Sequence, residues 1–192
     1  MMGRGRLGLA GWSAMRQRTR SAIVVAMSGG PPSDTELRSA VQALTGALIE
    51  LHRAAMNAAT AAFEQERGAV GTRLRLLELL MNDPFFAWLR PLSGLMAAID
   101  EGLDDPEPVD HTVAADARAI VEHLLDPPEG AARELADGLA ALLQREADVV
   151  LAAGALRKVL ARLPRHPPGS HPEAHARWHA RHRPRPHPRR QA

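Results

Sequence analysis

The sequence predicts an all-α protein: a helical bundle of about four to five helices with one long N-terminal helix, flanked by disordered basic ends. Aromatic residues make up only 3% of the 192 residues and tyrosine is absent, whereas Ala, Leu, Arg and Glu are abundant. This composition favours helices over strands. Apolar residues also recur at spacings of three and four along most of the chain, and no segment alternates with a period of two.

Charge is distributed unevenly along the chain. Residues 1–26 carry five arginines and no acidic residue, and residues 164–192 carry seven arginines and one acidic residue. The central residues 27–163 carry 12 basic and 21 acidic residues, so the net charge of +2 hides an acidic body between two basic ends. A basic isoelectric point therefore does not indicate that the body binds nucleic acid. We divide the chain into an extension (1–32), a helical domain (33–163) and a tail (164–192).

The N-terminal extension is rich in Arg and lacks acidic residues, which is typical of a targeting segment. Its apolar run, Ala22–Met27, is shorter than the core of a secretion signal. Met27 opens a stretch that leads directly into a helix, so we expect translation to start there, with a transit peptide as the alternative. No segment reaches the ~20 apolar residues of a membrane span. We expect a cytoplasmic protein without membrane contact.

The first predicted helix begins at a Ser-x-x-Glu capping box, Ser33–Glu36. Behind it, apolar residues at spacings of four and three form a heptad-type seam, and Gly68 and Gly71 end the helix. Such a seam either joins two chains into a homodimer or is buried within one chain. Its members are Leu37, Val41, Leu44, Leu48, Leu51, Ala55, Ala58 and Ala62.

The helical pattern continues in residues 72–82, where short helical turns carry a wide apolar face. Asp83 followed by Pro84 then predicts a new helix, because the carboxylate accepts from free amides and proline fits the first helical position. Pro91 removes a backbone hydrogen bond, which predicts a kink or break near Arg90. The wide apolar face consists of Leu74, Leu76, Leu77, Leu80 and Met81.

Further helical regions follow the break. The helix after the break should continue to the acidic stretch 99–110, which is expected to be a surface loop. Helices are then predicted over residues 111–126, from about residue 130, and from about residue 148 to Leu163.

Three of the four aromatic residues between Met27 and Leu163 occur together in the segment NDPFFAWLRPLSGL. In a bundle built from Leu, Ala and Val, such side chains fill the volume that small side chains leave. The segment therefore predicts a structural hub, with Arg90 binding a carbonyl that the kink frees. The alternative is a ligand or partner site, because aromatic and arginine side chains are also enriched at interfaces. The hub comprises Asp83, Pro84, Phe85, Phe86, Trp88, Arg90 and Pro91, with Phe63 as a neighbour.

This segment, with the long helix containing LIELHRAAMNAATAAFE, resembles a group of small bacterial helical proteins without assigned function. The resemblance implies a single helical domain over residues 37–163 and no particular activity. It rests mainly on Asp83, Pro84, Trp88, Leu89, Arg90, Pro91, Leu92 and Ser93.

The body offers little that is typical of catalysis or metal binding. Its three histidines, His52, His111 and His123, lack the Glu-x-x-His spacing of a di-iron bundle. No phosphate-binding loop, G-x-S-x-G or H-E-x-x-H motif occurs, and the absence of cysteine excludes thiolate sites. The acidic stretch lacks the alternation of an EF-hand loop. His52 lies beside the seam, which predicts a partly buried structural histidine.

The tail is rich in Pro, His and Arg, and Trp178 is its one large apolar residue. Such a segment buries too little apolar surface to offset the entropy of ordering, so residues 164–192 are expected to be disordered and dispensable. Four tail histidines would share a face if they were helical and could chelate a transition metal, although Pro172 opposes a helix. Weak, non-specific attraction to nucleic acid is another candidate role. These histidines are His171, His175, His179 and His182.

Two function classes remain. The favoured one is a non-catalytic protein-interaction module without a cofactor, whose partner is another protein or a second copy of the chain. The alternative is a small-ligand or metal-binding bundle with a pocket beside Trp88, Arg90 and His52.

Overall fold

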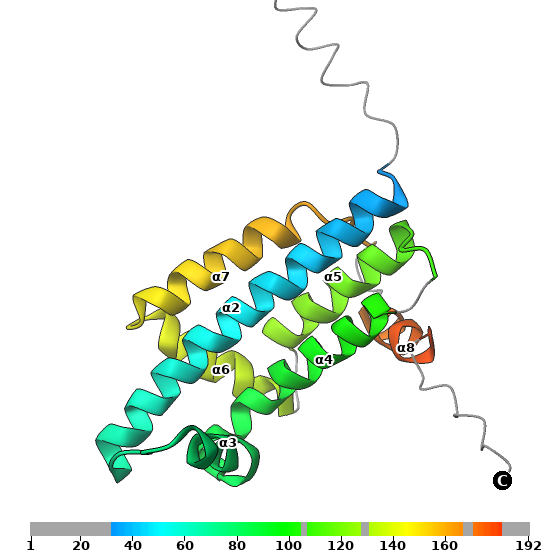
Figure 1. Ribbon diagram of the computed structural model, residues 1–192. Helices are drawn as coiled ribbons and strands as arrows, with labels where there is room; N and C mark the ends of the chain where they lie inside the picture. Colours follow the sequence, from blue (N-terminus) through cyan, green and yellow to red (C-terminus); the bar gives the residue numbers. More distant parts are fainter. Residues whose placement is uncertain (1–31, 105–106, 128–130, 167–170, 182–192) are drawn as a thin grey trace, which may run out of the picture. The chain divides into compact units, whose positions relative to one another are not determined.

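The described part of the chain is all-α, which confirms the predicted fold class (Figure 1). Contacts divide the chain into Met1–Pro32 and Ser33–Ala192, and every described helix belongs to the second unit. The described residues form seven α-helices and one 3₁₀ helix, more than the four to five expected, because α3 and α8 are separate helices. The computed structural model describes residues 32–104, 107–127, 131–166 and 171–181.

The long helix α2 spans Asp34–Arg67 and lies between α7 and α4 (Figure 1). Its predicted capping box forms: the Ser33 amide donates to the Glu36 carboxylate (2.7 Å), and the Ser33 hydroxyl accepts from the Glu36 amide (3.4 Å). Gly68 ends the helix at a φ of 92°, a value that other residues rarely adopt. The remaining elements are α3 (Arg73–Asn82), η1 (Pro84–Leu89), α4 (Arg90–Asp104), α5 (His111–Leu125), α6 (Ala131–Leu143), α7 (Ala147–Leu160) and α8 (His171–Arg181).

The predicted seam of α2 is buried inside its own chain. Its positions are buried as far as Ala55, but burial then moves from the predicted Ala58 and Ala62 to Ala59 and Phe63. A straight α-helix has 3.6 residues per turn, so its contact stripe drifts away from a strict seven-residue repeat. Of the two alternatives for the seam, contact between two chains or burial within one chain, the second therefore holds. The seam forms the centre of the core.

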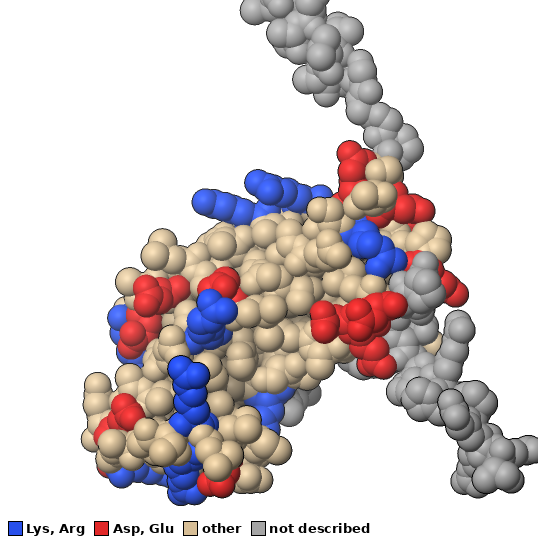
Figure 2. Space-filling view, viewed as in Figure 1, with Lys and Arg blue, Asp and Glu red and all other residues tan. Residues whose placement is uncertain are grey.

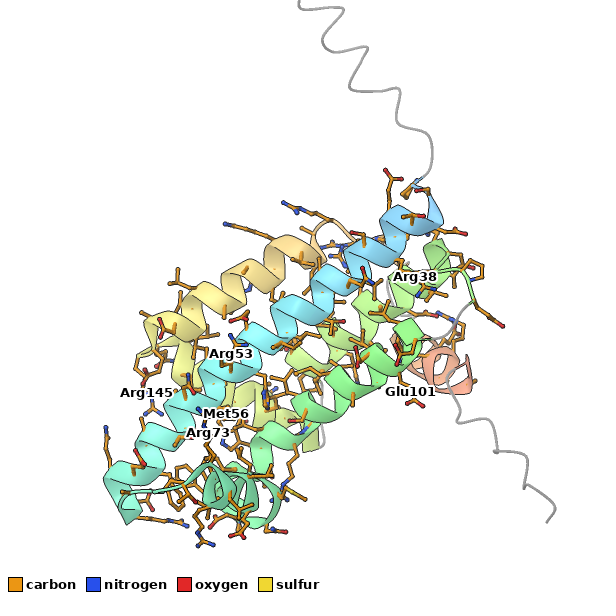
Figure 3. The ribbon with its side chains drawn as sticks, in the orientation of Figure 1. Arg38, Arg53, Met56, Arg73, Glu101 and Arg145 are labelled. Carbon is orange, nitrogen blue, oxygen red and sulfur yellow. The ribbon has the colours of Figure 1, made fainter. Side chains whose placement is uncertain are left out.

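The acidic stretch is helical for longer than predicted. Helix α4 continues to Asp104, so the first acidic residues lie in the helix instead of in a loop. Arg38 of α2 supports this extension, because its guanidinium donates to the carbonyl oxygens of Leu103 (2.6 Å) and Glu107 (2.7 Å). Carbonyl groups at a helix end lack partners within the helix. Figure 3 shows Arg38 and Glu101 at the same end of the bundle.

The structure corrects the prediction of a disordered tail over residues 171–181, which form α8. This helix contacts α5, and Trp178 is only 2% exposed. The prediction rested on the small number of apolar residues in the tail. It missed this contact because one tryptophan and a set of polar contacts hold α8 on the bundle. The predictions for residues 1–31, including the start site, and for His182 lie outside the described residues.

The surface in Figure 2 is unevenly charged. Acidic side chains gather by the start of α2 and the end of α4. Acidic and basic side chains both lie around α3. Among the described helices, none combines the length and the apolar content needed to cross a bilayer.

Candidate functional site: an aromatic hub that holds helix α3

Asp83 joins two helices at the predicted motif. Its amide donates to the last turn of α3, and its carboxylate accepts a hydrogen bond from the Phe85 amide (2.9 Å) at the start of η1. Pro84 occupies the first position of η1, where no amide donor is needed. The six-residue η1 changes into α4 at Arg90, immediately before Pro91. The predicted break near Arg90 is therefore confirmed.

The three phenylalanines form one cluster. The ring centroids of Phe63, Phe85 and Phe86 lie 5.1 to 5.3 Å apart, and Phe85 meets the other two edge to face. Phe86 is completely buried. Arg67, in the last turn of α2, lies over Phe63 (5.4 Å) and Phe85 (5.3 Å), and its guanidinium is 3.5 Å from the Asp83 carboxylate. The cluster thus fastens the end of α2 to η1.

Trp88 packs separately, on α6. Its half-buried indole covers Gly138 so closely that a Cβ atom at this position would lie 2.7 Å from Cε3 of the ring. Glycine allows this approach because it has no side chain. The aromatic side chains of the motif were predicted to fill one space between the helices. Instead, the phenylalanines fill space beside α2, and the tryptophan fills space beside α6.

Arg90 binds carbonyl groups that the helix break exposes. Its Nε donates to the Leu80 carbonyl (3.4 Å), and its Nη2 donates to the Asp83 carbonyl (3.2 Å). Both acceptors lie at the end of α3, where helical partners are missing. Arg90 therefore binds carbonyl groups, as predicted, but they lie at the end of α3 and are not the ones that Pro91 frees; the contact ties the start of α4 back to α3.

Helix α3 presents large apolar side chains to solvent. Thr72 caps its start by accepting from the Arg75 amide (3.1 Å), and Leu79 is its buried side chain. The predicted wide apolar face is divided: Leu76 and Leu80 are half-buried, whereas its other three members, at spacings of three and four, form an exposed line. Leu79, which was not among the predicted positions, lies in the core on the opposite side of the helix. We call this line the α3 ridge; it consists of Leu74 (68% exposed), Leu77 (52%) and Met81 (64%).

Charged side chains flank the α3 ridge. Arg75 pairs with Glu78 at 3.2 Å, and Arg73 makes no ion pair with a described residue. Arg73 is marked on α3 in Figure 3, and Figure 2 shows both charge signs in this region. The ridge is therefore an apolar line with basic groups at its α3 N-terminal end.

His52 has a structural setting, as its place beside the seam predicts. Its Nε2 lies 3.0 Å from the Ser93 hydroxyl on α4. Burial lowers the pKa of His52 below its ordinary value, because an imidazolium loses hydration there. His52 therefore favours the neutral form in the folded chain.

A cavity of about 860 Å³ lies between α2, α5, α6 and α7. Its walls are mainly Leu, Ala and Val side chains, and Glu122, Asp126 and Arg157 supply charged groups. None of the residues of the predicted pocket lines it. If the bundle binds a small ligand here, the motif segment is not the part that contacts it.

Two charged residues without a predicted role are buried in α5. Asp116 and Arg118 are 5% and 3% exposed. Arg118 pairs with Glu122 (2.8 Å) and donates to the Leu163 carbonyl (2.7 Å), while Asp116 binds Arg177 of α8. The sequence did contain a signal: within α5 the run 113–121 is apolar and alanine-rich except for these two residues, and an acid and a base in such a run indicate buried partners.

The tail histidines are only partly described. His171, His175 and His179 occur at intervals of four in α8, but their side chains lie outside what the structure describes, and metal binding by them stays a prediction. Pro172 does not prevent the helix, because it falls in the first turn, where proline is tolerated. Among the described side chains, no three metal-ligating groups come together.

No protein-family model matches the sequence, and the comparisons with curated proteins and with solved structures found no match.

Proposed function

We propose that the protein is a non-catalytic helical interaction module that binds another protein through the α3 ridge. The observation that carries this proposal is the exposure of Leu74, Leu77 and Met81 in one line on one helix. Adjacent large apolar side chains are unfavourable in water and typically mark contact sites. The other large apolar side chains that the described part of the chain exposes are Ile49, Val150 and Leu151.

The hub supports the proposal because it holds α3 in place while leaving the ridge outside. Leu79 anchors the helix from within, and Arg90 binds the Leu80 carbonyl at its end. The phenylalanine cluster fixes η1, which continues directly from α3. A surface that is rigid before binding loses little conformational entropy when a partner docks.

The chemistry of the ridge indicates the kind of partner. An apolar surface edged by carboxylates would cover the leucines and the methionine and would meet the charge of Arg73, which has no ion pair among the described residues. Three side chains form a small contact compared with the interfaces of stable complexes. We therefore propose reversible binding, as in a transient assembly.

A cytoplasmic location and kinship with the small bacterial helical proteins belong to the same proposal. The location rests on the short apolar run of the N-terminal extension, and the kinship rests on the sequence patterns of the motif segment and of the long helix.

Photo-crosslinking in cells of the source organism tests the proposal. Benzoylphenylalanine in place of Leu77 in the full chain should form a covalent adduct with a discrete protein, and Met81→Asp in the same chain should abolish it. The matched control carries the same group in place of Leu151 on α7, which is 72% exposed but lies outside the ridge, and should give no such adduct. Equal adducts at both positions, or none at Leu77, would contradict the proposal. An adduct of twice the chain mass would identify a second copy as the partner.

The cavity favours a second candidate function, the binding of a small apolar ligand. Its volume of about 860 Å³ lies in the range of known ligand pockets, and its lining combines apolar walls with a few charged groups. An apolar fluorescent dye should bind to the full chain. It should no longer bind to the Ala140→Trp variant, in which the indole fills the cavity. Leu77→Gln, outside the cavity, should leave dye binding unchanged. Equal dye binding by both variants would remove this candidate.

A further inference from the structure

Helix α8 packs on α5, and its described side chains make a small apolar contact there. Among its described side chains, Ala174 is completely buried and Trp178 is 2% exposed. The indole Nε1 of Trp178 donates to the Ala98 carbonyl of α4 (3.2 Å). One tryptophan and one alanine therefore supply the apolar part of the docking.

Small residues of α5 lie under α8. Ala115 and Ala119 of α5 are 1% and 3% exposed, although they lie on the side of the helix opposite to its core residues Val113 and Ala117. Their burial follows from the position of α8 over this side of α5. Without α8, α5 and the end of α4 would present a shallow apolar groove.

Asp116 gives this groove a specific chemical requirement. Asp116 is 5% exposed, and its carboxylate receives both arms of the Arg177 guanidinium, Nη2 at 2.7 Å and Nε at 3.2 Å. The His166 Nε2 lies 2.6 Å from the same carboxylate. A buried carboxylate needs a paired cation, and a two-armed contact selects a guanidinium. The groove thus requires an arginine next to a tryptophan.

The anchors of α8 follow the spacing of a docked helix. Ala174, Arg177 and Trp178 stand at positions i, i+3 and i+4, which is how an amphipathic helix enters a groove. An isolated helix of 11 residues is marginal in water, so α8 depends on its docking. Another helix with the same anchors can therefore compete for the groove.

We propose that the groove formed by α5 and the end of α4 is a helix-binding site, which α8 occupies as an intramolecular ligand. Its external ligand is a helix of another protein that carries a small residue followed, three and four positions later, by arginine and tryptophan. Binding of that helix displaces α8. This site is separate from the α3 ridge and does not depend on the function proposed for it.

Peptide binding to the full chain tests this proposal. The probe is a fluorescein-labelled peptide of residues 170–182, which reproduces the anchors. The double variant Arg177→Ala with Trp178→Ala empties the groove and should bind the peptide at least about tenfold more tightly than the unmodified chain, where tethered α8 competes at high effective concentration. Fluorescence anisotropy measures both dissociation constants.

Three controls define the site. Adding Asp116→Asn to the emptied chain should weaken peptide binding by at least about tenfold, because the guanidinium loses its charge partner. A peptide with Trp178→Ala should bind weakly to the emptied chain. Arg133→Ala, which removes an exposed arginine of α6 paired with Asp137, should leave α8 docked and behave as the unmodified chain does.

The outcomes that overturn the proposal are distinct. Absent binding to the emptied chain, or equal binding to the emptied and unmodified chains, would show that the groove is no exchangeable site. An emptied chain without cooperative unfolding by circular dichroism would make α8 an integral part of the core. A dimer of the unmodified chain that Trp178→Ala dissociates would make a second copy the external occupant, against the partner proposed.

Discussion

Gly138→Ala should leave the stability of the protein unchanged or lower it, although glycine to alanine within a helix ordinarily stabilises. The residue lies within α6, under the indole of Trp88. A Cβ atom at this position would lie 2.7 Å from Cε3 and 3.0 Å from Cδ2 and Cζ3. A rigid ring with three atoms in the way cannot yield as the end of a flexible side chain would. The side chain of Trp88 must therefore move, or the two helices must separate.

The magnitude follows from two opposing effects. Alanine in place of glycine in a helix gains about 1 kcal/mol of backbone free energy. Forcing extra volume into a packed contact costs about 1–3 kcal/mol. Gly154→Ala in α7 is the matched control, since no atom lies within 4 Å of its added Cβ, and it should show the gain alone. The free energy of unfolding of Gly138→Ala should thus lie about 1–3 kcal/mol below that of Gly154→Ala.

Thermal and urea unfolding, followed by far-ultraviolet circular dichroism, measure this difference. For a chain of this size, 1 kcal/mol corresponds to about 2–4 °C in Tm. Gly154→Ala should melt above the unmodified chain and Gly138→Ala at or below it. If Gly138→Ala stabilises as much as Gly154→Ala does, the contact between Trp88 and α6 is not formed as described.

Arg90→Lys should lower the free energy of unfolding by about 1 kcal/mol, because an ammonium cannot hold both carbonyl groups as the guanidinium does; an unchanged urea midpoint would contradict this. The folded-state pKa of His52 lies below its unfolded value, so stability should fall as pH drops through about 6.5. In a pH series of thermal melts, His52→Gln should flatten that decline, and an identical pH profile would refute it. Leu44→Glu with Leu51→Glu should abolish the helical circular dichroism signal, because both leucines lie in the core of one chain; a folded, dissociated monomer would instead place the seam between two chains.

Local signals in the sequence predicted much of the fold. The capping box at Ser33 and the proline after Asp83 place helix starts correctly, because such caps act through neighbouring backbone groups. The core positions of α2 were predicted correctly as far as Ala55, because apolar residues at spacings of four and three mark the buried side of a helix. Beyond that point the pitch of 3.6 residues per turn moves the buried stripe to Ala59 and Phe63, and Phe63 joins the phenylalanine cluster.

Contacts between distant segments were the part that local patterns missed. Trp88 is close to Phe85 and Phe86 in the sequence, but the 3₁₀ helix directs Trp88 to α6 and the two phenylalanines to Phe63 of α2. Helix α8 escaped prediction because its docking depends on a charge pair between Arg177 and Asp116, which are 61 residues apart. The division of α3 into a buried side and an exposed ridge also depends on its neighbours, since every leucine of that helix looks alike in the sequence.

The orientation of α3 is tested most directly by comparing Leu77→Ala with Leu79→Ala. The two leucines lie two positions apart on one helix, 52% and 6% exposed. If the hub holds α3 with its ridge outward, Leu79→Ala should cost about 2–5 kcal/mol of unfolding free energy, as for a buried leucine, and Leu77→Ala should stay within about 0.5 kcal/mol of the unmodified chain. Equal losses, or a larger loss for Leu77→Ala, would show that the ridge is buried and would remove the surface on which the proposed function depends.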